Sequence, residues 1–279
     1  MLYRPAGTLS AGSDPVALTP EEAGWEFSGL SVLKLEGGQS RPYDLGDNEA
    51  ALFALEGAAS VSAHGETFAL RQREGIFAGA PDVLYLPSGS SFQVTSPTGG
   101  EFALATARTA ASGSPFYIEA SQVPVEIRGA GSATRQINQL LGVGVSGPHR
   151  LIVVEVLTPA GNWSSYPAHK HDVLSDEECP LEEIYYFRFS TENGFGFHRT
   201  YTKDGEIDET VTVGDGDVFL VPRGFHGPTA APPGYPMYYL NVMAGPAERA
   251  WRICTDPAHA WLWEKWTSEE PDPRLPFTS

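Results

Sequence analysis

The residue types best suited to chemistry in this 279-residue chain are three histidines and a carboxylate in its second half. His169 and His171 are separated by one residue and are followed by Glu183 and His226. Because residues two apart in a strand point to the same side, the imidazoles of His169 and His171 should enter one shared space. These nitrogen and oxygen ligands suit a divalent ion such as zinc, manganese, iron or nickel and leave open coordination positions. The pattern therefore predicts a metal site that favours catalysis over a structural role.

The carboxylate of this site has several competitors in the sequence. Glu183 is preferred because it begins a run in which Tyr185 and Phe187 should point into a barrel with it, whereas Glu182 would face the opposite side. A solvated acidic loop explains most of the other acidic residues nearby, which are Asp176, Glu177, Glu178 and Glu182.

Further polar residues are candidates for moving protons and for holding a substrate. His198, in an expected strand, is a candidate acid or base, although such a histidine is more often packed or exposed. Tyr185 is a second catalytic candidate. Arg223 is the preferred counter-charge for a substrate anion, because it lies three residues before His226 and a guanidinium grips a carboxylate through two hydrogen bonds. The candidate substrate-binding cations are Arg223, Arg199 and Lys170.

Short strands are the elements that must position these residues. Apolar runs separated by turn residues recur along the chain, which contains 30 glycines and 23 prolines, and this rhythm favours an all-β sandwich or barrel with few short helices. Helical patterns are expected only at residues 132–141 and 246–253. The expected strands lie at residues 30–35, 51–55, 59–63, 83–86, 91–94, 102–105, 151–157, 183–189, 196–201, 209–213, 217–221 and 237–242.

The two halves of the chain look like two copies of one unit. The best alignment sets residues 84–91 against residues 219–226, which places Ser91 where the second copy has His226. The sole histidine before residue 149, His64, lies in a turn-like sequence. The first copy is therefore expected to bind no metal.

The predicted organisation is two tandem barrels joined by a connector at residues 113–148. A degenerate, metal-free barrel is expected at residues 1–125 and a metal-binding barrel at residues 126–279. The second barrel includes a Trp-rich tail, which should pack onto the barrel or onto a second subunit of a homo-oligomer. The tryptophans of this tail are Trp251, Trp261, Trp263 and Trp266.

Charge and cysteine content narrow the classes of function. A formal net charge of −17 opposes binding to nucleic acid and to anionic membrane surfaces, so neither is an expected partner. Only two cysteines are present, which is too few for a disulfide framework and favours a reducing compartment. The first residues lack a signal-peptide pattern, and no run of about 18 apolar residues occurs. The chain is therefore expected to be cytoplasmic.

These motifs resemble a known family. The spacing of the histidines and Glu183 resembles the two cupin motifs, and the duplication resembles a bicupin. More narrowly, the chain is similar to the 5-deoxyglucuronate isomerases of inositol catabolism. The segments that carry this similarity are Arg128-Gly-Ala-Gly131, Arg135-Gln-Ile137, residues 163–172, 182–188, 194–199 and 221–228. The carboxylate follows His171 by twelve residues instead of the usual five or so of cupins, which fits the narrower family.

The resemblance implies a particular reaction, the conversion of 5-deoxy-D-glucuronate into 5-dehydro-2-deoxy-D-gluconate by one divalent ion, zinc or manganese. The base that carries the C2 proton to C1 remains open between a metal-bound hydroxide, a pocket Glu or Tyr, and His198. The alternative functions are a metal-dependent cupin dioxygenase or decarboxylase and a non-catalytic sugar-binding bicupin.

Overall fold

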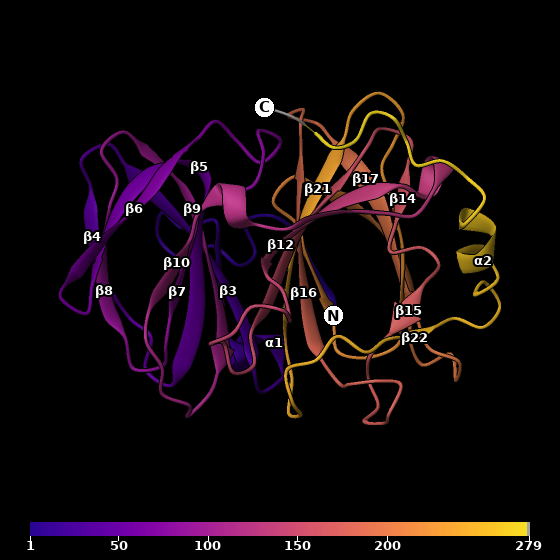
Figure 1. The fold of residues 1–279 in the computed structure, drawn as a ribbon, viewed down its shortest axis with the longest axis horizontal. Helices are drawn as coiled ribbons and strands as arrows, with labels where there is room; N and C mark the ends of the chain where they lie inside the picture. Colours follow the sequence, from indigo (N-terminus) through magenta and orange to yellow (C-terminus); the bar gives the residue numbers. More distant parts are fainter. Residues whose placement is uncertain (278–279) are drawn as a thin grey trace.

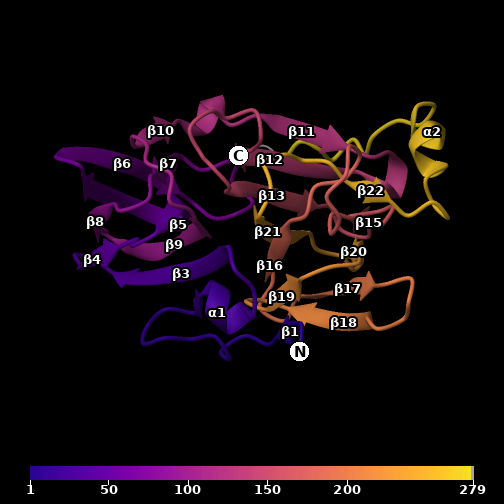
Figure 2. The same ribbon diagram turned by 90° about the horizontal axis from the view of Figure 1, so that it is seen from below.

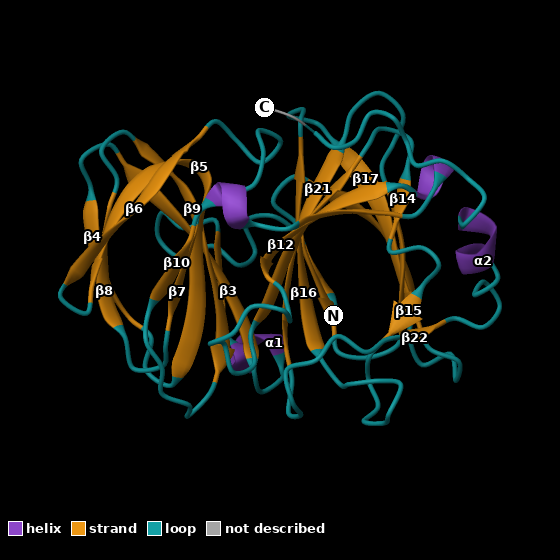
Figure 3. Ribbon diagram, in the orientation of Figure 1, coloured by secondary structure: helices purple, strands orange, loops and turns teal. Residues whose placement is uncertain are grey.

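The computed structural model describes residues 1–277 and consists mainly of antiparallel strands, which confirms the predicted all-β class (Figures 1 and 3). Two strand assemblies lie side by side, one built from the first half of the chain and the other mainly from the second. Residues 278 and 279, at the end of the predicted second barrel, lie outside the described residues. Within residues 1–277 no helix has the length and apolar character needed to cross a bilayer.

The first assembly is a nine-stranded sheet organised around one long strand, β5. One end of β5 pairs with β7 and β9, and the other end pairs with β6 and β8, so the sheet curls around it. Gly57 allows the bend at a φ of 95°, where a side chain would meet the Gly99 carbonyl at 2.6 Å. The strands are β2 (Val16–Leu18), β3 (Ser28–Glu36), β4 (Ser40–Asp44), β5 (Asn48–Ala63), β6 (Glu66–Arg73), β7 (Val83–Leu86), β8 (Ser91–Thr95), β9 (Gly99–Arg108) and β10 (Phe116–Ile118).

The second assembly is made of two facing sheets, which Figure 2 shows from below. In order across the seven-stranded sheet, the strands are β1 (Tyr3–Arg4), β19 (Val218–Val221), β16 (Glu182–Phe189), β21 (Met237–Ala244), β13 (Ile152–Thr158), β12 (Arg135–Leu141) and β11 (Val125–Arg128). The six-stranded sheet contains β18 (Asp208–Gly214), β17 (Phe195–Tyr201), β20 (Phe225–Ala230), β15 (His169–Lys170), β22 (Cys254–Thr255) and β14 (Trp163–Ser164). The chain thus begins in the second assembly, because β1 pairs with β19.

Helices are short, and the prediction of helices at residues 132–141 and 246–253 is wrong. Residues 135–141 form strand β12 because they pair on both sides with β11 and β13. Residues 246–253 are not helical, and the Arg249 side chain there instead donates hydrogen bonds to five backbone carbonyls, those of Leu141, Gly142, Val143, Val145 and Leu151. Tertiary contacts override a weak local preference. The helices are α1 (Pro20–Ala23), α2 (Leu262–Trp266), and the 3₁₀ turns η1 (Ala120–Gln122) and η2 (Gly131–Ala133).

Alternation along the strands divides the apolar side chains among separate cores. In β16, Ile184 and Tyr186 join a core that lies between the two assemblies, whereas Tyr185 and Phe187 enter the interior of the second assembly. In β5, Phe53 likewise belongs to the shared core, and its neighbours Leu52 and Ala54 fill the interior of the first assembly. The second assembly is therefore anchored to the first by the outer face of the strand that carries Glu183.

Two carboxylates tie the assemblies together in a reciprocal manner. Glu49 of β5 accepts hydrogen bonds of 2.8, 2.6 and 2.9 Å from the backbone N–H groups of residues 149–151, just before β13. Glu182 of β16 accepts bonds of 2.7, 2.9 and 2.8 Å from those of residues 26–28, at the start of β3. Three successive backbone donors satisfy each carboxylate, which is a strong arrangement for an ionised acceptor.

Candidate functional site

The three histidines and Glu183 meet inside the second assembly. His169 on β15 lies directly opposite His226 on β20, and β16 of the facing sheet supplies Glu183. The Nε2 atoms of His171 and His226 each lie 3.0 Å from Glu183 Oε2, and those of His169 and His226 lie 3.2 Å apart. One ring nitrogen from each of the three histidines lies within 4.8 Å of a ring nitrogen of each of the other two. The structure therefore brings together all four residues that the sequence singles out.

Backbone carbonyls orient two of these imidazoles. His171 Nδ1 and His226 Nδ1 each lie 3.1 Å from a carbonyl oxygen, that of Leu181 and that of Gly224. A carbonyl accepts only an N–H, so each of these two rings carries a proton on Nδ1 and directs its Nε2 atom at the centre. Gly224, at a φ of 95°, is needed because a side chain there would meet the Tyr201 carbonyl at 2.8 Å. This donor set fits a divalent metal ion.

Burial and mutual contact set the charge states of the cluster. Burial alone would raise the pKa of Glu183, but the neighbouring His226 and His171 hold that pKa well below its usual range. Burial lowers the pKa of His169 well below its ordinary value, whereas hydrogen bonding to Glu183 raises that of His171 despite its burial. A carboxylate that stays ionised and a neutral imidazole are the forms that coordinate metals.

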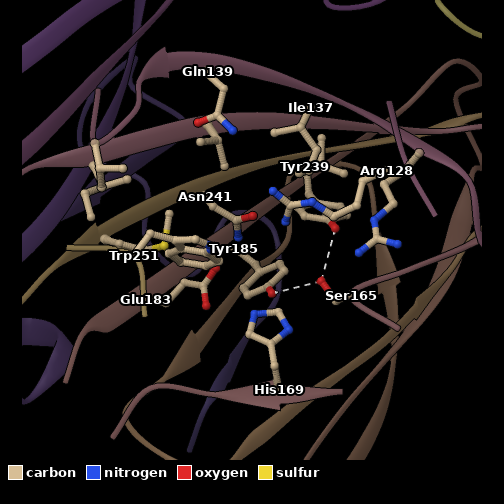
Figure 4. Close-up of a pocket in the computed structure, with 16 residues that line it drawn as sticks. Arg128, Ile137, Gln139, Ser165, His169, Glu183, Tyr185, Tyr239, Asn241 and Trp251 are labelled. Carbon is tan, nitrogen blue, oxygen red and sulfur yellow. Dashed lines mark hydrogen bonds between the residues drawn. The ribbon is translucent and has the colours of Figure 1, made fainter. Parts of the chain in front are cut away.

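A cavity opens beside this cluster and encloses about 630 Å³ of empty space, its open mouth included (Figure 4). The walls are mainly apolar, with a few polar groups facing one another. The lining residues are Arg128, Arg135, Ile137, Gln139, Val143, Ile152, Val154, Val156, Ser165, His169, Glu183, Tyr185, Tyr239, Asn241, Met243 and Trp251.

Three hydroxyl groups form a chain on the cavity wall. Ser165 Oγ lies 3.3 Å from the Tyr185 hydroxyl and 3.2 Å from the Tyr239 hydroxyl, and Figure 4 shows both contacts. Ser165 holds a left-handed backbone conformation, with a φ of 47°, which is strained for a residue other than glycine. Burial raises the pKa of Tyr185 well above its ordinary value, so this hydroxyl keeps its proton at neutral pH.

His198 lies behind Tyr185 and is not among the residues that line the cavity. Its Nδ1 atom lies 2.8 Å from the Thr229 hydroxyl, and its Nε2 atom lies 3.1 Å from that of Thr200. Burial lowers the pKa of His198 to about 3, which keeps the ring neutral. Both nitrogen atoms are thus engaged away from the cavity.

The three cations proposed from the sequence also lie outside the cavity lining. Arg223 is paired with Glu206 and, at 3.4 Å, with Asp204 in the adjoining turn. Arg199 is partly exposed and lies 2.9 Å from Asp208. Lys170 is held by Glu178 at 2.8 Å and by Asp172, so each of the three already has acidic partners.

Two arginines that the sequence analysis assigns no role, Arg128 and Arg135, line the cavity instead. They lie opposite each other on β11 and β12. Their only sequence signal is their place in the first two segments that resemble the isomerase family, within a region predicted as a connector.

The tail covers the cluster from another side. The Trp251 ring lies 5.8 Å from the rings of both His169 and His171, in centroid distance. Two residues before it, Arg249 fixes the segment to backbone carbonyls of β12 and of the loop that follows. An apolar ring at this place excludes water from the cluster.

Two curled antiparallel assemblies with a three-histidine, one-glutamate cluster inside one of them define a cupin-type protein. The fold agrees with that of the oxalate decarboxylase of Lactobacillus farciminis, with a TM-score of 0.61 over 86% of this chain and 82% of that chain. The identity is 15%, so this likeness concerns the fold alone.

The chain belongs to the KduI/IolB family, whose model matches residues 2–262. It is 43% identical to the 5-deoxy-glucuronate isomerase of Geobacillus thermodenitrificans, over 89% of this chain and 91% of that protein. The enzyme of the same name from Bacillus subtilis strain 168 is 40% identical, over 85% of this chain and 88% of that protein. The crystal structure of an IolB-like protein from Salmonella typhimurium LT2 superposes with a TM-score of 0.89 at 37% identity, covering 94% of this chain and 99% of that one.

Proposed function

We propose that this protein is a metal-dependent aldose–ketose isomerase that converts 5-deoxy-D-glucuronate into 5-dehydro-2-deoxy-D-gluconate, a reaction of inositol catabolism. The relatives named 5-deoxy-glucuronate isomerase support it, because they resemble this chain over most of their length. The observation that carries the proposal is the cluster of imidazoles and Glu183 beside a cavity that His169 and Glu183 line.

The cofactor of this proposal is one divalent ion, zinc or manganese, held by His169, His171, Glu183 and His226. When bound, the ion supplies Lewis-acid polarisation of the substrate oxygens on C1 and C2. The Nδ1 contacts of His171 and His226 to carbonyls keep their Nε2 atoms directed at the site.

Tyr185 is the catalytic candidate that the cavity favours. Its hydroxyl keeps its proton, lies at the cavity wall, and contacts Ser165, which also contacts Tyr239. Such a hydroxyl donates to a substrate oxygen on which negative charge grows when the C2 proton leaves. The sequence also predicts His198 as a catalytic residue; its ring packs against that of Tyr185 with centroids 4.8 Å apart, so in this proposal it is a positioning residue for Tyr185.

The isomerase proposal is tested with the metal-loaded protein and 5-deoxyglucuronate in deuterated water. The reaction breaks the C2–H bond, forms a C1–H bond and conserves mass, so the expected product is the ketose with solvent label on C1 or with the original hydrogen transferred there. Turnover without oxygen uptake or carbon dioxide release distinguishes it from a dioxygenase or decarboxylase. An inactive but metal-loaded protein would contradict it.

The division of the chain into a metal-free barrel at residues 1–125 and a metal-binding barrel at 126–279 belongs to the same proposal, although strand β1 pairs with β19 of the second barrel. It requires about one ion per chain, measured by elemental analysis after reconstitution. Homo-oligomerisation also stays a prediction, supported by the exposed rings of Trp261 and Trp263 in the tail and measurable by analytical ultracentrifugation.

A further inference from the structure

Arg135 is a buried cation without an acidic partner of its own. Its side chain lines the cavity and is almost fully buried, and its hydrogen bonds run from Nη1 to the Ala133 carbonyl at 3.1 Å and the Tyr166 carbonyl at 3.3 Å. Among residues 1–277 no ion pair to Arg135 is present within 4.0 Å. Burial lowers its pKa to about 10, which leaves the group charged at neutral pH. An uncompensated charge in a protein interior is costly unless a ligand neutralises it.

The neighbouring Arg128 provides an internal contrast. Its guanidinium forms two parallel hydrogen bonds to the Glu126 carboxylate, of 2.7 and 2.8 Å, and Gln139 donates a third bond of 3.2 Å to the same carboxylate. The only acidic group on this part of β11 is therefore already satisfied by Arg128. Of the two cavity arginines, Arg135 is the one whose charge is free to meet an anion.

A second donor in the same cavity also lacks an acceptor. Asn241 on β21 is buried and lines the cavity, and its Nδ2 atom has no hydrogen-bond partner among the described residues. Asn241 lies opposite Tyr185, two residues from the Glu183 position on the neighbouring strand, so its side chain belongs to the same wall as the cluster. A buried donor without a protein acceptor is satisfied by a water molecule or by a ligand in the cavity.

We propose that Arg135 forms an anion subsite in this cavity that holds the carboxylate of a sugar acid, while Asn241 donates to one of its hydroxyl or carbonyl oxygens. The proposal deepens the proposed isomerase function, on which it rests for the identity of the acid. Arg135 takes the place that the sequence assigned to Arg223, whose charge is met by Asp204 and Glu206 at an exposed turn. The mainly apolar walls strengthen the ion pair because they keep water away from it.

The test compares two substrates that differ only in charge, 5-deoxyglucuronate and its neutral C6 amide. Arg135→Met should raise KM for the uronate by at least about 30-fold and change KM for the amide far less, since one partner of a buried, hydrogen-bonded charge pair is removed. Arg135→Lys should recover part of the loss, because the charge remains without the fork geometry. Arg128→Met should have a smaller effect on the discrimination between the two substrates.

Stability and metal content separate binding from folding. Arg135→Met should bind the metal as the wild type does and should melt at no lower temperature, because a buried unpaired charge is gone. Should that variant fail to fold, the lysine variant still measures the discrimination. The subsite would be overturned if the Arg135 variants raised KM equally for the uronate and the amide, or if both variants kept the wild-type ratio of the two KM values. If Arg223→Met instead raised KM for the uronate alone, the carboxylate site would lie at the exposed turn.

The subsite and the isomerase function fail in different ways. If the wild type turns over 5-deoxyglucuronate but the Arg135 variants prefer the uronate over the amide as strongly as the wild type does, the isomerase function stands and the subsite is wrong. If the wild type binds the uronate more tightly than the amide in calorimetric titration, through Arg135 but without turnover, the subsite stands and the isomerase assignment is wrong. Asn241→Leu, of similar volume, should weaken both substrates alike.

Discussion

The two assemblies of this protein contain equivalent strand pairings that carry different residue types. In the second, Glu183 pairs with Val221 across β16 and β19, and the equivalent pair in the first is Ala50 with Leu86 across β5 and β7. His169 lies opposite His226, and the corresponding pair in the first assembly is Asp44 with Ser91. The equivalent positions there carry no imidazole and no buried carboxylate.

The interior of the first assembly is closed where the second is open. Leu52, Ala54, Phe102 and Leu104 pack into a continuous apolar core there, whereas the equivalent region of the second assembly contains the cluster and its cavity. A barrel that keeps no site can fill its interior and contribute stability, while a barrel that keeps one must tolerate a cavity and buried charge. Under the proposed function, stability and chemistry are therefore divided between the halves.

The largest expected effect comes from removing one imidazole. His171→Ala should abolish metal binding and turnover and leave the fold largely intact, because an open catalytic site does not supply most of the folding free energy. Activity, metal content and thermal melting are measured together. The matched control is Ser91→Ala, which alters the position equivalent to His226 in the first assembly and should change none of the three. A His171→Ala protein that keeps its metal would contradict the site.

A core substitution in the first assembly should affect stability alone. Phe102→Ala should lower the free energy of unfolding by about 3–5 kcal/mol, because Phe102 is fully buried in the closed core. Val156→Ala, in the cavity wall, should cost less, since part of the space beside it is already empty. Denaturant unfolding gives both values, and kcat measured on the folded fraction should be unchanged in Phe102→Ala. A large fall in that kcat would show that the first assembly shapes the site.

The reciprocal carboxylates allow a matched comparison across the interface. Glu49→Gln and Glu182→Gln should each lower the free energy of unfolding by about 1–3 kcal/mol, because an amide cannot satisfy three backbone donors as a carboxylate does. Only Glu182→Gln should also weaken metal binding, since Glu183 is the next residue. Denaturant unfolding and metal titration on both variants decide this, and equal effects on metal binding would remove the asymmetry.

The smallest expected effect is a difference in acid sensitivity. Burial would raise the pKa of Asp82, but its hydrogen bonds, led by those from Arg71, hold the pKa below the usual 3.8. A lowered folded-state pKa stabilises the protein above about pH 3.8, and this contribution is lost as the pH falls further. Asp82→Asn should therefore have a lower free energy of unfolding than the wild type near neutral pH, and this difference should shrink as the pH falls below about 3.8.

The metal should leave at higher pH than this, because His171, whose pKa is raised by hydrogen bonding to Glu183 despite its burial, must be neutral to bind it. Metal content and the free energy of unfolding, each measured as a function of pH, give the pH of metal release and the pH at which stability is lost. Metal retained below pH about 3.8 would contradict the order, as would an Asp82→Asn protein whose stability follows pH as in the wild type.

The sequence predicted the class of fold and the grouping of the cluster because both depend on short-range patterns. Strand alternation places His169 and His171 together, and the Pro-x-Gly turn before His226 returns that residue to the same place. The aromatic run after Glu183 indicates the strand that carries it. These features are visible in a few consecutive residues.

The proposed anion subsite and strand β12 could not be predicted in the same way. Residues 135–139 contain one apolar side chain, that of Ile137; Arg135 faces the cavity beside it, and Asn138 on the other face donates to the buried Glu155 carboxylate, so no apolar periodicity is present. The exposed partners of Arg223 come from a neighbouring turn, which only the tertiary structure reveals. The residue types indicated that an arginine would hold the substrate anion, but they could not indicate which arginine lacks an acidic partner.

The reciprocal contacts of Glu49 and Glu182 carry a consequence for the origin of this chain. Each half lends a carboxylate from one strand to the backbone that enters the equivalent strand of the other half, as two identical subunits do across a twofold axis. Such an exchange is self-complementary, so one ancestral barrel could have formed it with its own copy before the genes were fused. Within one chain such a pairing is permanent, so the first half holds the second in place although its own equivalent positions, Asp44 and Ser91, carry no imidazole.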